Sequence, residues 1–167
     1  MVINQLQNEN RKITKTMGSF SVLESLKDES VSPWNATTSY FMAKMGVRRR
    51  QVIATLKGDQ TIVTQAGAMQ WMAGNVEVTT GVKGAGDFLG KMVKGAVTKE
   101  SGIKPEYKGK GYLVLEPTYK YLILMDVEEW GTSGVSVEDG MFLACEGTVD
   151  RKVVARKSIS SAIMGGE

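Results

Sequence analysis

Apolar and polar side chains alternate along several short segments of the chain, and this period of two is typical of half-buried strands. The segment FSVLESL at 20–26 shows the pattern, and VEVTTGV at 76–82 repeats it. Further strands are expected at 48–56, 61–67, 108–118, 119–130, 133–140, 141–147 and 148–157, with a short apolar piece at 68–72. Short strands separated by Gly-rich turns predict a mainly all-β fold, a sandwich or a barrel-like sheet.

Turn chemistry and local composition separate these strands. KGDQ at 57–60 and AGN at 73–75 are expected to be turns. The segment 27–38, rich in Ser, Pro, Asn and Thr, predicts a loop. SYFMAKMGV at 39–47 fits either a short helix or a strand, and its glycine is expected to end either one.

One segment, DFLGKMVKGAVT at 87–98, has a helical period instead. Its apolar residues recur along one side of a helix, with lysines off that side. Two interpretations stay open: a helix that caps the sheet, or a basic amphipathic helix that docks on a partner or on an anionic membrane. The apolar residues that define this candidate interaction surface are Phe88, Leu89, Met92 and Val93.

The chain is expected to form a single β-rich domain over residues 1–167, with 1–18 as an N-terminal arm or strand. A shift of 73 positions superposes two sets of residues, which suggests an internal repeat with units at about 48–100 and 121–167. The superposed residues are Gly58, Gly67, Gly74 and Val76 on Gly131, Gly140, Gly147 and Val149. The repeat favours duplicated β-sheet units, as in a duplicated β-sandwich.

Composition narrows the function classes. The chain has no histidine, which removes imidazole as a base or metal ligand and excludes any catalytic triad that needs one. No catalytic, metal-binding or cofactor-binding residue is predicted, and we expect no enzymatic activity. The single cysteine, Cys145, lies in an apolar segment and is expected to be a small buried side chain.

The same composition bears on compartment. One cysteine excludes an internal disulfide framework, which favours a reducing compartment. The N-terminal residues contain no apolar signal core, and no apolar run reaches the length needed to span a bilayer. We therefore expect a cytoplasmic protein.

Two local motifs invite a nucleotide or nucleic-acid interpretation. GAGDFLG at 84–90 has the wrong glycine spacing for a dinucleotide loop, and Asp87 would repel phosphate. Arg48, Arg49 and Arg50 form a basic run, which fits a solvated or ion-paired strand face and, as the alternative, a nucleic-acid contact. A net charge of +3 is too small to argue for nucleic acid by itself.

The stretch VTQAGAMQWMAGNVEV carries the pattern G-A-M-x-x-M-x-G-x-V, followed by a Gly-rich segment and the helical segment. It resembles the altered-inheritance-of-mitochondria number twenty-four family, over residues 45–167. The resemblance rests on Gln65 and on the family-motif residues Gly67, Ala68, Met69, Met72, Gly74 and Val76. It implies a duplicated β fold like a double-stranded β-helix, similar to that of the trp RNA-binding attenuation protein, with no catalytic residues to carry over.

Family chains usually run on beyond the GGE at 165–167, so this resemblance implies a short or truncated form with an unpaired sheet edge. We therefore expect a non-enzymatic intracellular scaffold that acts as a homo-oligomer, binds an unidentified protein partner and makes peripheral membrane contact. Two alternatives stay open. One is a nucleic-acid-binding module with a Lys and Arg stripe around residues 48–50; the other is a β-barrel that binds a small molecule.

Overall fold

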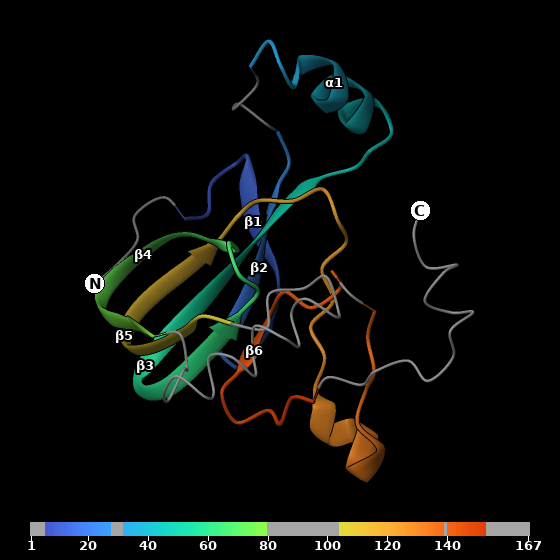
Figure 1. Cartoon of the computed structure of the whole chain (residues 1–167). Coiled ribbons are helices and arrows are strands. Elements are labelled where there is room, and N and C mark those ends of the chain that lie inside the picture. Colours follow the sequence, from blue (N-terminus) through green and yellow to red (C-terminus); the bar gives the residue numbers. More distant parts are fainter. Residues whose placement is uncertain (1–5, 28–31, 80–103, 139, 153–167) are drawn as a thin grey trace.

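The computed structural model describes residues 6–27, 32–79, 104–138 and 140–152, and the part described is mostly one antiparallel sheet (Figure 1). The strands follow the order β1-β2-β3-β5-β4, and β6 also pairs with β3. The strands are β1 (Arg11–Met17), β2 (Phe20–Ser25), β3 (Arg49–Thr64), β4 (Met69–Thr79), β5 (Glu106–Leu115) and β6 (Ala144–Glu146). The expected all-β fold is confirmed, and the described sheet is open rather than closed into a barrel.

The first two strands form a hairpin. Met17 pairs with Phe20, so the turn between them contains only two residues. Gly18 in this turn has a φ of +53°, which a glycine adopts at little cost. The strand expected at 20–26 is thus confirmed as β2, and β1 lies in residues 1–18, which were expected to form an N-terminal arm or strand.

β3 is the central strand, and it passes through a predicted turn. KGDQ at 57–60 does not turn the chain back; it lies inside a 16-residue strand. The pairing of β3 with β5 shifts register between Lys57 and Thr61, and Gly58 has a φ of +126°. The predicted turn is therefore wrong: the turn-like residues form a bulge, because β5 pairs with the strand on both sides of it.

β4 also passes through a predicted turn. AGN at 73–75 lies within an 11-residue strand whose Gly74 pairs with Gly111 of β5. A Cβ added to Gly74 would lie 2.5 Å from the carbonyl oxygen of Lys110. Gly74 therefore lies where β4 and β5 approach each other too closely for a side chain, and the chain does not turn there. The predicted turn is wrong.

The strands expected between 119 and 152 are mostly absent from the described residues. Thr118 makes an isolated bridge with Arg50, and the chain from 119 to 126 forms no strand. A 3-10 helix, η1 (Val127–Ser133), follows, and Asp126 caps it by accepting the Glu128 backbone N–H at 3.0 Å. Beyond it the described residues contain one short strand, β6, so the predictions of longer strands here are wrong.

The segment left open between helix and strand is a helix, α1 (Ala36–Lys44). It begins inside the predicted loop 27–38, which is correspondingly shorter. The last residue of the helix is Lys44. Gly46, which was expected to end the segment, follows with a φ of +70°. The N–H groups of Gly46 and Val47 bond to the carbonyls of Ala43 and Met42, the paired pattern by which a glycine commonly terminates a helix.

Apolar side chains cover both faces of the sheet. The larger cluster is Val52, Ala54, Leu56, Ile62, Tyr107, Leu113 and Leu115, with Leu122 and Leu143 from the later loops packed against it. The smaller cluster is Leu23, Ile53 and Val114, with Leu6 and Ile13 from the N-terminal residues. Consecutive residues of β3 and β5 thus alternate between two small cores, which explains their long apolar runs.

The predicted helix at 87–98 lies outside the described residues, and so do Phe88, Leu89, Met92 and Val93. The internal repeat remains a prediction. Gly67 and Gly140 have similar φ values of +75° and +77°. The next superposed pair, Gly74 and Gly147, differs, because Gly74 lies inside β4 whereas Gly147 follows the end of β6.

Candidate interaction surfaces

The family-motif residues form the turn into β4 and the strand itself. Gly67 takes the left-handed conformation, and the Ala68 N–H donates to the carbonyl of Gln65 at 3.1 Å. Ala68 is buried, and its carbonyl accepts the N–H of Glu116 at 2.7 Å, which fastens the turn to the end of β5. The turn role predicted for Gly67 is confirmed.

The two motif methionines do not fill the core. Met69 and Met72 are 36% and 42% exposed, and Trp71 between them is 38% exposed. Val76, by contrast, packs against the larger core cluster. Met69, Trp71 and Met72 are therefore partly exposed rather than core-filling side chains, because β4 lies at the end of the strand order.

β4 is an edge strand with an apolar character. Among the described strands it pairs only with β5. The strand contains no Lys, Arg or Pro, the residues that commonly protect sheet edges from pairing. We define the β4 edge by its exposed apolar side chains, which are Met69, Trp71, Met72 and Val78.

The apolar residues of the β4 edge lie on both faces of the sheet. Met72 pairs with Leu113, and paired residues of antiparallel strands share a face, so Met72 lies on the face of the larger cluster. Trp71 pairs with Val114 and lies on the other face. Apolar side chains therefore flank the outer backbone of β4 above and below.

Each of the three arginines of the run interacts with other residues of the fold. The Arg50 Nε lies 3.0 Å from Glu24 Oε2, and both side chains are largely buried. The Arg50 guanidinium also stacks over Tyr121 at 4.9 Å from the ring centroid. Arg48 donates to the Leu26 carbonyl, and Arg49 has partners of its own. The structural interpretation, a face with an ion pair, is the one that these contacts favour.

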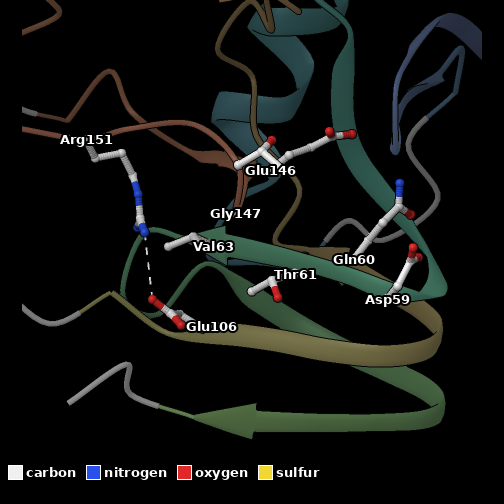
Figure 2. Close-up of a pocket in the computed structure, with 9 residues that line it drawn as sticks. Asp59, Gln60, Thr61, Val63, Glu106, Glu146, Gly147 and Arg151 are labelled. Atoms are coloured by element: carbon white, nitrogen blue, oxygen red, sulfur yellow. Dashed lines mark ion pairs between the residues drawn. The ribbon is translucent and has the colours of Figure 1, made fainter. Parts of the chain in front are cut away.

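A polar groove of about 440 Å³ lies where β3, β5 and β6 meet (Figure 2). Arg151 reaches across it to Glu106, with 3.7 Å between Nη2 and Oε1. The Gln60 Oε1 is buried and has no hydrogen-bond partner among the described residues. The described residues contain no group of three or more His, Cys, Asp or Glu placed to hold a metal ion.

Cys145 lies in β6, opposite Val63 of β3, and is half-buried. Burial raises the pKa of the Cys145 thiol above its ordinary value, against the lowering effects of Arg151 and Lys104 nearby. The thiol is thus protonated at neutral pH, which makes it a poor nucleophile. The expectation of a buried side chain is met only in part, because Cys145 is half-buried.

One exposed cluster was missed by the sequence reasoning. Trp34 and the α1 residues Tyr40 and Phe41 are exposed, as is Met45 at the end of the helix. Their spacing produces no single apolar stripe, so the pattern did not separate helix from strand. The signal present in the sequence is compositional: aromatic residues in a segment without acidic residues.

A comparison with protein families decides the relationship. The family model described as mitochondrial biogenesis AIM24 matches residues 44–167. The chain belongs to the mitochondrial biogenesis AIM24 family. The matched part of the AIM24 chain contains β3, β4 and β5 and leaves out the β1–β2 hairpin.

The AIM24 description relates the chain to mitochondrial biogenesis and names no reaction, ligand or partner. No curated protein and no solved structure matches the chain. The likeness to the trp RNA-binding attenuation protein therefore stays a prediction. Within the described part of this AIM24 chain, no helix is long and apolar enough to cross a membrane.

Proposed function

We propose that this AIM24 protein is a non-enzymatic scaffold that acts as a homo-oligomer, and that two copies associate through the β4 edge. The observation that carries the proposal is an 11-residue edge strand with four exposed large apolar side chains and no protecting Lys, Arg or Pro. The open side of an edge strand offers a row of backbone N–H and C=O groups to another strand.

Symmetry favours a second copy as the partner. A two-fold axis beside β4 places the β4 strands of two copies antiparallel to each other. The β4 edge of one copy then contacts the β4 edge of the other. The two sheets then join into one, and Trp71 and Met72 lose water on opposite faces. The contact uses backbone hydrogen bonds for affinity and the apolar side chains for added stability.

The non-enzymatic part of the proposal rests on what the chain offers for chemistry. The sequence contains no histidine. The Arg151–Glu106 pair crosses the polar groove. A nucleic-acid partner is not proposed, because Arg50 pairs with Glu24 and Arg48 donates to a backbone carbonyl. Cytoplasmic localisation stays a prediction.

Sedimentation equilibrium over a range of protein concentrations tests self-association. Val78 and Val137 are a matched pair, at 51% and 50% exposed, the first on the β4 edge and the second in a later loop. Val78→Lys places a charge on the edge and should shift the protein toward monomer. Val137→Lys should leave the association constant unchanged.

A wild-type chain that stays monomeric at the highest concentration would refute the proposal. Equal effects of the two lysine variants would also count against it, because the weakening would then reflect added charge rather than the β4 edge. Met72→Lys provides a second edge variant at a different position of the strand, and it should reproduce the result for Val78→Lys.

A further inference from the structure

The segment around α1 is an apolar projection from the molecule. Figure 1 shows α1 standing apart from the sheet. Trp34, just before the helix, is 98% exposed, and Met45, at its end, is 75% exposed. Tyr40 and Phe41 between them are more than half exposed. Large apolar side chains gathered at this level of exposure mark an interaction site.

The two sides of α1 have different roles. Ser39 is buried and hydrogen-bonds Tyr119 at 3.2 Å, which ties the helix to the loop after β5. The side away from this contact carries Tyr40, Lys44 and Phe41, which span an arc of about 100° at about 100° per residue. The Tyr40 and Phe41 rings pack edge to face at 5.4 Å, and the Lys44 Nζ lies 5.6 Å from the Tyr40 ring centroid.

The sequence around α1 contains more basic than acidic residues. No acidic residue occurs from position 30 to position 58. Residues 27–50 contain five basic side chains against the acidic Asp28 and Glu29, and one of the five, Arg50, is already paired with Glu24. Arg48 and Arg49 line a groove of about 360 Å³ between α1 and the end of β2, so this charge lies next to the helix.

We propose that this α1 surface, made of Trp34, Tyr40, Phe41, Lys44 and Met45, docks on the surface of an anionic lipid bilayer. Exposed aromatic rings and a methionine, on a short helix and on the residues next to its two ends, can enter the boundary between headgroups and acyl chains. Lysine can lay its apolar stem along that boundary while its ammonium group reaches the headgroups. Basic residues beside the helix add attraction to anionic lipid.

A bilayer fits this surface better than an acidic peptide does. A bound peptide needs a groove that surrounds its anchoring side chains. Trp34 projects almost wholly into solvent. The groove near α1 is lined by Ser39, Ala43 and Tyr40, whereas Trp34 and Phe41 lie outside it. A projecting set of rings with adjacent positive charge matches a flat, deformable and negatively charged surface.

The docking proposal stands apart from the proposed homo-oligomer, because the two use different residues. It assigns the membrane contact expected from the sequence to α1, whereas the sequence pattern suggested the segment 87–98. A weak single contact gains strength when an oligomer presents several copies to one membrane. The two proposals can therefore be refuted independently, one by substitutions on α1 and the other by substitutions on the β4 edge.

Co-sedimentation of the full chain with vesicles tests the proposal. The probes are vesicles of phosphatidylcholine mixed with phosphatidylserine, and vesicles of phosphatidylcholine alone. The wild-type chain should bind the mixed vesicles, more weakly as salt is raised, and bind the neutral vesicles poorly. The double variant Trp34→Ala with Phe41→Ala should bind the mixed vesicles at least about tenfold more weakly than the wild type.

Trp130→Ala is the matched control, because Trp130 is also exposed but lies on η1. It should bind the mixed vesicles as the wild type does. A variant of α1 that keeps wild-type binding, or a control that loses as much, would overturn the proposal. A double variant that instead changes the association state in the absence of lipid would show that α1 is a protein interface.

Tryptophan fluorescence locates the contact directly. The chain has three tryptophans, so Trp71→Phe with Trp130→Phe leaves Trp34 as the only reporter. Its emission should shift to the blue on mixed vesicles and be quenched by brominated acyl chains in them. The counterpart that keeps only Trp130 should show neither effect. Quenching of Trp130 but not of Trp34 would contradict the assignment.

Discussion

Glu146 of β6 accepts a hydrogen bond from the backbone N–H of Ser19, at 2.9 Å, between residues 127 positions apart in the sequence. β2 and β6 pair along the same side of β3, at Arg49–Ala54 and at Ile62–Thr64. The Glu146 carboxylate joins the β1–β2 turn to β6 at the point where the one strand ends and the other begins. A Cβ at Gly18 would lie 2.6 Å from its Oε1, so a larger residue in this turn would displace the Glu146 carboxylate.

Glu146→Ala should lower the free energy of unfolding by about 1–3 kcal/mol, the usual cost of removing a charged partner from a buried donor. Denaturant unfolding followed by circular dichroism measures it. Glu129→Ala, at an exposed carboxylate of η1, should change the same free energy by less than about 0.5 kcal/mol. Equal losses in both variants would show that the Ser19 contact contributes no special stability.

Ser19→Ala separates the backbone donor from the side chain. The Ser19 hydroxyl is buried and has no hydrogen-bond partner among the residues described, whereas its N–H holds Glu146. Alanine keeps the N–H and removes an unpaired polar group, so the free energy of unfolding should stay the same or rise. A clear loss in the same denaturant experiment would mean that the hydroxyl has a partner in solution.

Gly111→Ala should destabilise the pairing of β4 with β5. An added Cβ would collide with the Ala73 carbonyl oxygen and would lie 2.8 Å from Val76 Cγ2. Overpacking of this kind costs about 1–3 kcal/mol. Gly67→Ala is the comparison, because a Cβ there meets nothing within 4 Å and costs only backbone strain, about 1 kcal/mol. Thermal unfolding should rank Gly111→Ala as the less stable variant; the reverse order would contradict the close approach of the strands.

Arg50→Ala should destabilise the fold by about 1–3 kcal/mol, because it leaves the largely buried Glu24 carboxylate without its cation. Lys57→Ala removes an exposed basic residue from the same strand and should cost less than about 0.5 kcal/mol. Chemical denaturation of both variants measures the difference. If Arg50→Ala were as stable as the wild type, the arginine run would be a solvated face without structural consequence.

The Cys145 thiol should react slowly with iodoacetamide at neutral pH. Burial raises its pKa in the folded chain, so the thiolate forms at higher pH there than in the unfolded chain. The protonated thiol therefore contributes stability below the unfolded pKa, and this stability is lost as pH rises through the folded pKa. Alkylation rates in buffer and in denaturant, measured across pH, should give a higher midpoint for the folded chain. An equal or lower midpoint would mean that the thiol is activated.

The sequence predicted the fold class and the strands whose pattern is local. FSVLESL forms β2 as predicted, although its consecutive residues Val22 and Leu23 are both buried, so both faces of the strand are covered rather than one. Gly46 ends α1 and Gly67 forms a turn, because each adopts a positive φ that the local chain itself requires. The family-motif segment was found because its residues carry a family likeness, and the match at 44–167 agrees.

The errors arose where distant strands decide the outcome. KGDQ and AGN have the composition of turns, yet pairing with β5 holds both segments in extended strands. YLILMDV has the apolar character of a strand, but it forms none here, and Leu122 packs on the core cluster from a loop. The exposure of Met72 and Trp34 depends on the positions of β4 and α1 at the margins of the fold, which no local pattern records.

The most direct test of self-association through the β4 edge is hydrogen exchange of the β4 amides at low and high protein concentration. Within Met69–Val78, the amides that point away from β5 should exchange more slowly at high concentration, because a second copy pairs with the open edge. Amides of β2, which lies between two strands, should exchange at a rate independent of concentration. Exchange in β4 that does not change with concentration would contradict the account.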